Sequence, residues 1–528
     1  MPGSFFSSYV KNTMRADEFI PSGFGDAAAR AAAVARAASR SVSPSLLAEL
    51  AEQHARLPAS ASRRRALDDL ARAGTVAVVT GQQVGLFLGP LYTIYKAATA
   101  VVLARALAAE TGVRAVPIFW LATEDHDFAE IDHCVVARAG GEPLRLRVDG
   151  DGRSDGRQPV ARVRLGAAVS TAVEAVAEAL RGRPAGAEVA ALLRECYQPE
   201  RTFGEAFAAL LATLFADEGL IVFDPRRPAV AQLAARPWRT ALERAPAIVA
   251  RLAERDRALG AAGLAAQVSL RPDSALVFHH GHHGGSSDDG DGPRQLVRAA
   301  EAGRLVAELE RAPMRFSSSA LLRPIVQDSL FPSAAYVGGP AEVSYLAQSA
   351  ALYDLFDLPV PLVAPRARFR LVDARTRGRL KTLGLAPADL EAPRDALLQR
   401  LGATRTRPSP AELRARLWST PAAELAALAA PLAALDPGLG RALDRTRATV
   451  ERAIERLLGR YARAAAIRDG EAVAALDRAR ALVYPDDAPQ ERVFAFPSFA
   501  ADAGPRAFIR AIVAAVDPFD PRVRDLDA

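Results

Sequence analysis

A buried strand, a glycine-rich polar loop and a helix follow one another within residues 75–99 (TVAVVTGQQVGLFLGPLYTIYKAAT), and this unit constrains the fold most. Positions 76–79 are all apolar, as a parallel strand covered on both faces requires. Thr80 and Gly81 end that run, and Pro90 suits the first position of a helix. Apolar residues then recur at helical spacing. We therefore predict a strand, a loop and a helix in that order.

The loop is expected to bind a ligand. In α/β folds, the loop after a parallel strand meets a helix N-terminus, where unpaired backbone N–H groups and the helix dipole favour an anion. Glycines allow the backbone to turn sharply or to approach a ligand closely. The substrate-binding residues predicted in and after the loop are Thr80, Gly81, Gln82, Gln83, Gly89 and Tyr92.

Lys96 lies on the predicted helix and is one of few lysines. The chain has 67 Lys plus Arg, yet lysine occurs only at positions 11, 96 and 381. Where nearly every cation is arginine, a lysine in this unit suggests that a compact ammonium group is needed against a phosphate or carboxylate. The alternative is a chance lysine on a solvated face.

A second apolar run at 115–121 (AVPIFWL) predicts a neighbouring strand that ends in a cluster of ionisable residues. Glu124, Asp125, His126 and Asp127 follow it after Ala122 and Thr123. Such a cluster suits metal binding or proton removal, because neighbouring carboxylates raise the basicity of an imidazole. We predict that His126, Asp125, Asp127 and Lys96 are catalytic. The structural alternative is that Asp125 or Asp127 caps a turn at 128–133.

Residues 316–348 repeat the pattern of the opening unit. A short strand leads into Gly338 and Gly339, and Pro340 then starts a helix with Glu342 in its first turn. This predicts a second helix N-terminus ready for an anion, although a plain strand-to-helix turn would look the same. A last short strand ends at Arg366. The further substrate-binding residues predicted here are Arg323, Gln327, Asp328, Tyr336, Gly338, Gly339, Glu342 and Arg366.

The order of elements predicts an α/β protein with a doubly wound core and a helical domain. Strands alternate with helices up to residue 370, with inserted connecting segments at about 140–200 and 260–312. Residues 371–484 are helical, and residues 485–528 return to the core. Along one helix, apolar residues recur at alternating spacings of three and four residues, and Arg447 is the charged exception. This spacing predicts a coiled coil of about three heptads, formed within the chain or between two chains. Its apolar members are Leu443, Val450, Ile454, Leu457, Tyr461 and Ala464.

The histidine-rich stretch at 279–293 (HHGHHGGSSDDGDGP) has two interpretations. His279 to His282 spell the H-x-G-H pattern of nucleotidyltransferases, and four close histidines also suit a metal. Yet the nucleotide-binding histidines belong at a helix start, which the following glycines, serines and Asp-Gly pairs cannot form. We favour a low-complexity hairpin tip and assign no metal ligands.

Composition excludes several classes of function. A net charge of +6 over 528 residues, without a basic cluster interleaved with aromatics, gives no indication of nucleic-acid binding. Two cysteines cannot form a disulfide framework and fit a reducing cytoplasm, where both are expected to be small buried hydrophobes. No run of 18 apolar residues and no signal peptide occur, so we expect a cytoplasmic protein without a membrane span.

Four segments together resemble a known family. TGQQVGLFLGPLYTIYKA, PIFWLATEDHDFAEIDH, LLRPIVQDSLFPSAAYVGGPAEVSYLAQ and YPDDAPQERVFAF are similar to blocks of the bacillithiol-biosynthesis cysteine-adding enzymes, the BshC family, in the same order along nearly the whole chain. The resemblance implies a Rossmann-like core with two connecting insertions and a coiled coil used for homodimerisation. It also implies that cysteine is joined to the amine of glucosaminyl-malate in the last step of bacillithiol synthesis.

Amide formation from a carboxylate needs activation, so the nucleotide ATP or ADP is expected beside the two small-molecule substrates. We expect Lys96 with the amides of Gly338 and Gly339 to face the activated group, and His126 to accept the amine proton. Arg323 or Arg366 would pair with the malate carboxylates. The alternatives are another adenylate-forming or nucleotidyl-transferring enzyme, and a non-catalytic coiled-coil protein that binds a metabolite.

Overall fold

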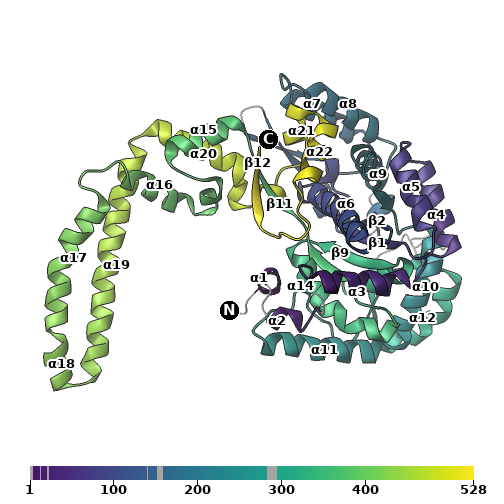
Figure 1. Ribbon diagram of the computed structural model, residues 1–528, viewed down its shortest axis with the longest axis horizontal. Helices are drawn as coiled ribbons and strands as arrows, with labels where there is room; N and C mark the ends of the chain where they lie inside the picture. Colours follow the sequence, from purple (N-terminus) through teal and green to yellow (C-terminus); the bar gives the residue numbers. More distant parts are fainter. Residues whose placement is uncertain are drawn as a thin grey trace. The chain divides into compact units, whose positions relative to one another are not determined.

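The chain divides into two compact units. The computed structural model describes residues 4–11, 14–20, 23–138, 141–151, 159–281 and 294–527. Met1–Phe369 and Glu491–Arg524 form one unit, here called the core unit, and Arg370–Gln490 with Asp525–Ala528 form the other, the helical unit. The ribbon of each is drawn in Figure 1. The core unit is thus built from two separate stretches of the chain, with most of the helical unit between them in the sequence.

A five-stranded parallel sheet lies at the centre of the core unit. Its order is β10-β9-β1-β2-β5, so the strand of the opening unit is central. This confirms the predicted fold class. The strands are β1 (Val76–Gln82), β2 (Ala115–Leu121), β5 (Ile221–Phe223), β9 (Ser333–Gly338) and β10 (Leu362–Pro365).

Strand β1 runs further than its apolar residues indicate. Gly81 and Gln82 still pair with Trp120 and Leu121 of β2, so the strand ends at 82 rather than at 79. A Cβ atom on Gly81 would lie 2.7 Å from the carbonyl oxygen of Trp120. Only glycine therefore allows β1 to continue beside β2 and to deliver both glutamines to the carboxyl edge of the sheet.

Helices cover both faces of the sheet (Figure 1). Helix α6 (Tyr92–Thr111) connects β1 to β2, and α14 (Pro340–Ser349) follows β9 towards β10 in the opposite direction. Because parallel crossovers are right-handed, connections in opposite directions place their helices on opposite faces. The sheet is therefore doubly wound, and the carboxyl ends of β1 and β9 form its switch point.

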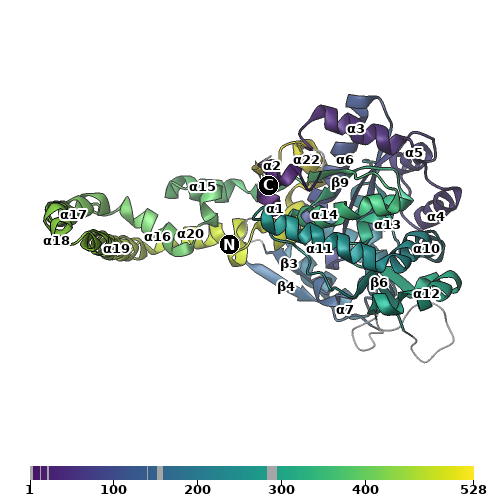
Figure 2. The ribbon, with the colours of Figure 1, turned by 90° about the horizontal axis from the view of Figure 1, so that it is seen from below.

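The remaining elements surround this sheet, and Figure 2 shows them from below. Those before β1 are α1 (Phe5–Val10), α2 (Met14–Asp17), α3 (Ala27–Ala38), α4 (Pro44–Ala55) and α5 (Ala61–Leu70). Those between β2 and β5 are β3 (His133–Ala137), β4 (Pro143–Arg147), α7 (Ala168–Ala179), α8 (Gly186–Cys196) and α9 (Phe203–Leu214). Those between β5 and β9 are α10 (Pro228–Glu243), α11 (Ala245–Ala261), β6 (Ser274–His280), β7 (Arg294–Arg298), α12 (Ala299–Arg311), β8 (Phe316–Ser318) and α13 (Arg323–Leu330).

The segment that returns after the helical unit holds the opening loop in place. Leu91 N donates to Phe494 O at 2.8 Å, and Ala495 N donates to Val135 O at 2.8 Å. Helices α21 (Pro497–Ala503) and α22 (Pro505–Ala515) follow. The start of α6 is thus anchored by residues about 400 positions later in the sequence. Bringing such distant segments together costs chain entropy, but this cost grows only slowly with the length of the loop between them.

The helical unit has its own hydrophobic core, in which Leu397, Leu401, Leu476 and Val483 are buried. Along α19, the residues buried within the chain are Leu458, Ala462 and Ala466, whereas Leu457 of the predicted seam is 58% exposed. The intramolecular contact therefore runs along a stripe of one leucine and two alanines spaced by four. The helices are α15 (Ala374–Leu383), α16 (Arg394–Ala403), α17 (Pro410–Ala427), α18 (Ala429–Leu435), α19 (Gly438–Ile467) and α20 (Gly470–Val483).

Gly402→Ala should lower the thermal midpoint of the helical unit. A Cβ atom at this position of α16 would lie 1.7 Å from the carbonyl oxygen of Ala462, so the two helices would have to separate. Overpacking of this kind costs about 1–3 kcal/mol. The measurement is thermal and chemical denaturation. The matched control is Gly440→Ala on α19, where nothing lies within 4 Å, and the better helix propensity of alanine should leave stability unchanged or higher. Equal midpoints for both variants would contradict the close packing.

Three further sequence expectations can be compared with the described residues. Of the histidine-rich stretch, residues 282–293 lie outside the described residues; β6 and β7 on either side pair in antiparallel register, with His280 opposite Arg294. Among the helices that the structure describes, none is long and apolar enough to cross a membrane. Both cysteines, Cys134 and Cys196, are buried, as predicted.

Candidate active site

The loop after β1 is a tight turn with several residues at positive φ. Phe87 has φ 50°, Leu88 has φ 68° and Gly89 has φ 62° with ψ −152°. The φ and ψ angles of Gly89 are accessible only to glycine. Gly85 packs against it, and a Cβ atom on Gly85 would lie 3.1 Å from the Gly89 Cα. Leu88 N donates to the hydroxyl of Tyr197 at 3.2 Å. The loop is thus shaped by the core around it and by its glycines.

Lys96 is buried at the carboxyl edge of the sheet and is surrounded by oxygen atoms. Its Nζ donates to Gly81 O and to Gln82 Oε1, both at 2.7 Å, and forms an ion pair with Glu342. Only 3% of the side chain is exposed. Burial lowers the pKa of Lys96 to about 8, although the charge of Glu342 opposes this shift. A compact ammonium does lie at this position, but it faces a carboxylate of the protein itself.

Glu342 fills the second predicted anion site. Its Oε2 accepts a hydrogen bond from Gly339 N at 2.8 Å, and its Oε1 accepts one from the Tyr336 hydroxyl at 2.7 Å. Burial opposes its ionisation, yet the charges of Lys96 and Arg323 lower the pKa of Glu342 below the usual value. The helix N-terminus at Gly339 is therefore occupied by its own side chain, which differs from the expectation that Gly339 and Lys96 face an external anion.

The lowered pKa of Lys96 predicts a pH-dependent stability. The folded chain loses this proton near pH 8, whereas an unfolded lysine keeps it up to about pH 10.4, so between these values the unfolded state binds more protons. The free energy of unfolding of the native protein should therefore rise with pH across this window, relative to that of a Lys96→Met variant. Chemical denaturation of both proteins from pH 7.5 to 10 measures this difference; a constant difference would contradict the shift.

A second cluster lies at the end of β2. The Asp125 carboxylate accepts hydrogen bonds from Gln83 Nε2 at 2.5 Å, from the His126 backbone N at 2.8 Å and from Arg294 Nη1 at 2.9 Å. Burial opposes its ionisation, but the neighbouring His126 side chain, the charge of Arg294 and the hydrogen bonds from the His126 backbone and Gln83 hold the pKa of Asp125 far below its usual range. The side chain of His126 is 42% exposed, so its ring can reach a ligand.

The two clusters form one continuous site. Gln82 contacts Lys96, and the adjacent Gln83 contacts Asp125, so the two amides at the end of β1 reach in both directions. Glu124, the residue before Asp125, is buried. Its burial raises its pKa, and the charges of Arg226, Arg294 and Arg323 oppose the rise. A buried carboxylate thus lies in the electrostatic field of arginines from both clusters.

The two arginines proposed for the malate carboxylates differ in availability. Arg366 is almost fully buried and forms two hydrogen bonds of 2.8 Å with Glu491. Arg323 is partly exposed, and its guanidinium contacts the hydroxyl of Tyr345. Because Arg366 already has a bidentate carboxylate partner, Arg323 is the better candidate for an anionic substrate.

The described residues contain no cluster of metal-binding side chains. No group of three or more His, Cys, Asp or Glu side chains that could hold a metal ion occurs among the described residues.

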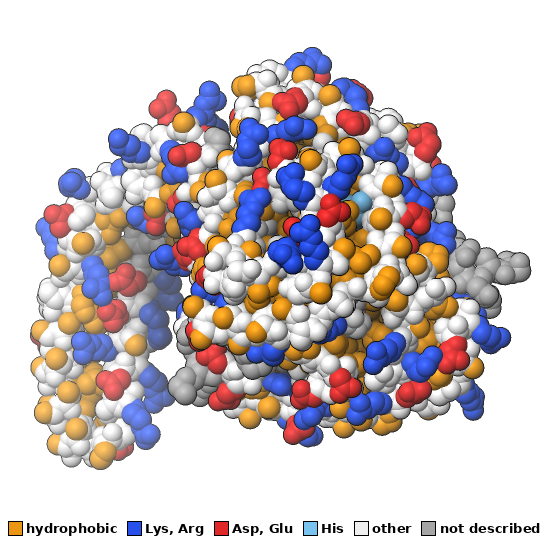
Figure 3. Space-filling view, turned by 45° about the vertical axis from the view of Figure 1, so that its right-hand side comes forward, with side chains coloured by type: hydrophobic (Ala, Val, Ile, Leu, Met, Phe, Trp, Pro, Cys, Tyr) orange, Lys and Arg blue, Asp and Glu red, His pale blue; other side chains and the backbone are white. Residues whose placement is uncertain are grey.

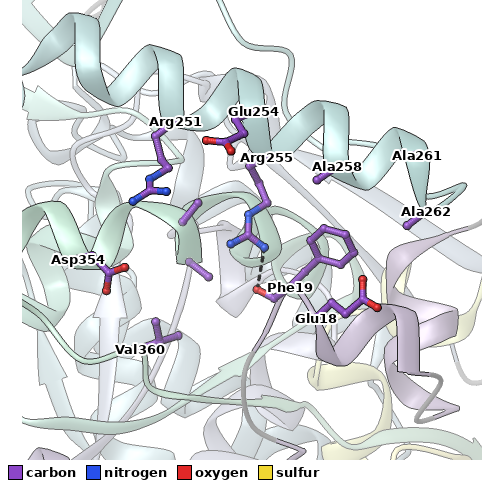
Figure 4. Close-up of a pocket in the computed structure, with 12 residues that line it drawn as sticks. Glu18, Phe19, Arg251, Glu254, Arg255, Ala258, Ala261, Ala262, Asp354 and Val360 are labelled. Carbon is purple, nitrogen blue, oxygen red and sulfur yellow. Dashed lines mark hydrogen bonds between the residues drawn. The ribbon is translucent and has the colours of Figure 1, made fainter.

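A separate pocket of about 790 Å³ lies elsewhere in the core unit, and Figure 4 shows Arg251, Arg255 and Phe19 at its wall. None of the residues that line this pocket belongs to the predicted site. On the face that Figure 3 shows, basic and acidic side chains are intermixed.

Both parts of the chain match domains of one family. Residues 3–367 match the family described as "Bacillithiol biosynthesis BshC, N-terminal Rossmann-like domain", and residues 369–524 match "Bacillithiol biosynthesis BshC, C-terminal coiled-coil domain". The chain belongs to the BshC family.

Curated BshC proteins support this membership over most of their length. The relative from Solibacter usitatus is 39% identical over 441 residues, which cover 83% of this chain and 82% of the relative. The relative from Salinibacter ruber is 34% identical over 493 residues, or 92% and 89% of the two chains. The relative from Geobacillus thermodenitrificans is 30% identical, over 84% and 82%. All three carry the name "Putative cysteine ligase BshC".

The predicted residues of this BshC-family chain do not all meet at one place. Thr80 donates to Val337 O at 2.8 Å and ties β1 to β9. Asp328 is buried and accepts hydrogen bonds from Gln327 and from Tyr353 of the adjacent helical turn, so these contacts are structural. Asp127 is exposed and makes no side-chain cap of the turn Phe128–Glu130. The Arg366 guanidinium lies over the ring of Tyr92, and Gln82 Nε2 donates to the Tyr92 hydroxyl at 3.5 Å.

Arg294 and Tyr345 of the candidate site escaped the sequence interpretation, and Glu491 adds a carboxylate to the same site. Arg294 begins β7 directly after the low-complexity stretch, Glu491 follows the helical unit, and Tyr345 lies one turn beyond Glu342. Only Tyr345 had a local signal, since position i+3 from Glu342 faces the same side of the helix. Arg294 reaches the site from a distant segment, for which no periodicity or spacing gives a signal.

Proposed function

We propose that this chain is a ligase that joins the carboxyl group of L-cysteine to the amine of glucosaminyl-malate, the last step of bacillithiol biosynthesis. The observation that carries the proposal is the match of both domains to the BshC family, whose curated relatives are named as cysteine ligases. The arrangement at the carboxyl edge of the sheet supports it, because a partly exposed imidazole lies there beside the Asp125 carboxylate and the buried Arg294 guanidinium.

The chain's own residues suit binding of both substrates. Arg323 would pair with a malate carboxylate, for which a guanidinium offers bidentate hydrogen bonds. The His126 side chain is 42% exposed and would contact the reacting groups. Lys96 and Glu342, which already neutralise each other, would hold Gly339 and the end of β1 in position. ATP would supply the activation that amide formation from a carboxylate requires.

A mass-spectrometric assay tests this function. Purified protein is incubated with cysteine, glucosaminyl-malate and ATP-Mg, and a parallel sample lacks ATP. We expect the cysteinyl amide only in the presence of ATP. Its formation without ATP would contradict the proposed activation step. No product in either sample, from protein that is folded, would contradict the ligase assignment or one of the two substrates.

We also propose that the protein forms a homodimer through the helical unit. Large apolar side chains that are exposed in the single chain are concentrated between residues 417 and 467. Burying such residues against a second copy would remove apolar surface from water. They are Leu417, Leu428, Leu435, Leu457 and Ile467. Light scattering after size-exclusion chromatography should give twice the 56.0 kDa chain mass, and a mass of one chain would contradict the dimer.

A further inference from the structure

His126 lies between a carboxylate and a guanidinium that approach the same ring nitrogen. Arg294 Nη1 is 3.1 Å from Nδ1 with hydrogen-bond geometry. Asp125 Oδ1 is 3.3 Å from Nδ1, and this oxygen already accepts hydrogen bonds from Arg294 and from the His126 backbone N. Of these two contacts of Nδ1, only the one with Arg294 has the geometry of a hydrogen bond, and we infer the state of Nδ1 from it.

A guanidinium has N–H groups and no lone pair to offer. When Arg294 donates to Nδ1, this nitrogen must carry the lone pair, and the hydrogen of the neutral ring is on Nε2. We propose that His126 acts as a hydrogen-bond donor, through Nε2–H, to a carboxyl or acyl oxygen of the substrate, and that Arg294 is the positioning residue that imposes this role. The identity of that oxygen rests on the proposed ligase function, whereas the position of the hydrogen does not.

Arg294 is held firmly enough to impose one arrangement. Its side chain is 8% exposed, Nη2 donates to Ser318 O at 2.8 Å, and the guanidinium lies 3.8 Å from the ring centroid of Phe278. These contacts come from β6 and β8, while Asp125 holds Nη1. The planar group thus has a fixed orientation before a substrate arrives.

This role differs from the expected general base. A ring that carries hydrogen on Nε2 cannot accept an amine proton at that atom. It can stabilise an oxygen on which negative charge develops, and a prearranged donor of this kind typically contributes 10²–10³-fold to turnover. The charged groups around the ring are Asp125 and Arg294, with Asp127 and Glu130 on the following turn.

His133 provides an internal comparison. Its Nδ1 lies 2.9 Å from Asp132 Oδ1, so a neutral His133 should carry its hydrogen on Nδ1, the opposite of His126. Both rings are about half exposed, which makes both observable and tolerant of substitution. The ¹⁵N spectra of histidine-labelled full-length protein, assigned with His126→Gln and His133→Gln variants, distinguish the two tautomers. Hydrogen on Nε2 in His126 supports the proposal, and hydrogen on Nδ1 overturns it.

Two amide substitutions test the donor role. Glutamine places its NH₂ group near the position of Nε2, whereas asparagine places it near Nδ1. We expect His126→Gln to keep at least about ten-fold more of the wild-type kcat than His126→Asn or His126→Ala. Equal losses in all three would overturn a donor through Nε2. The effect on KM identifies the oxygen: a raised KM for one substrate with kcat kept indicates a carboxylate of that substrate, and a lowered kcat indicates an oxygen that becomes charged during reaction.

Arg294→Met should release the ring. Without the guanidinium, Asp125 becomes the partner of Nδ1, and the His126 spectrum should change to that of His133. If this variant does not fold, the wild-type spectrum and the glutamine–asparagine comparison still decide the proposal. An inactive wild type would contradict the ligase function alone, because the tautomer is measured without substrate. An unchanged His126 tautomer in folded Arg294→Met would overturn the positioning role of Arg294.

Discussion

His126→Ala should lower the turnover number of the ligase reaction by about 10²-fold to 10³-fold, the range found when a donor to a developing negative charge is removed. The His126 side chain is 42% exposed, more than those of Asp125 and Arg294, so a substrate can touch it. The protein should remain folded, because the buried partners keep their contacts with one another. Steady-state kinetics with cysteine, glucosaminyl-malate and ATP measures the effect.

The control for this variant is His133→Ala. His133 is also exposed and also lies beside an aspartate, but it belongs to β3 and contacts none of the candidate site residues through the bonds described. Its turnover should equal that of the native protein. If His126→Ala kept the native rate, His126 would have no part in the chemistry, whichever role is assigned to it.

Lys96→Arg should greatly reduce activity although the charge is kept. The ammonium lies among Gly81 O, Gln82 Oε1 and Glu342, with almost no exposed surface. A guanidinium is larger and planar, so it must displace the loop or the start of α14, and overpacking a buried site costs about 1–3 kcal/mol. Lys96→Met should be worse for stability, because Glu342 would lose its buried cation at a cost of about 3–5 kcal/mol.

Denaturation curves and kinetics of these variants separate stability from activity. Lys381→Arg is the matched control, since this lysine of the helical unit is exposed and should tolerate the change. The pH profile adds a second criterion: if the charge of Lys96 is needed, kcat/KM of the native enzyme falls as pH rises through about 8, while residual activity of Lys96→Arg shows no such fall. Full activity of Lys96→Arg would refute the importance of an ammonium at this position.

Local patterns predicted the parts of the fold that depend on neighbouring residues. The apolar run at 76–79 and the glycines correctly indicated β1 and the loop, and the helical spacing indicated α6, which begins at Tyr92 rather than at Pro90. Burial of Lys96 could not be inferred in this way, since it depends on Glu342 from a different strand-helix unit. Sequence periodicity reports which side of an element faces the core, and it does not report which distant charge lies opposite.

The start of α14 differs from the predicted anion site because Glu342 caps it. Gly339 and Glu342 have the spacing of a capping box, in which the N3 carboxylate returns to the first backbone N–H. Considered in that way, the sequence would have indicated that this helix N-terminus provides its own anion. The same spacing argument has no counterpart for Arg294, whose place beside His126 follows from the pairing of β6 and β7.

The late return of the chain to the core unit has a consequence for its synthesis. Arg366 leaves the ribosome long before Glu491, because residues 370–490 are made in between. At about 5–20 residues per second, these roughly 120 residues take about 6–24 s to translate. During that interval Arg366 has no carboxylate to pair with, and the loop before α6 lacks Phe494 and Ala495. The nascent core must therefore wait in an incomplete state, exposed to proteases and chaperones, until the last segment emerges.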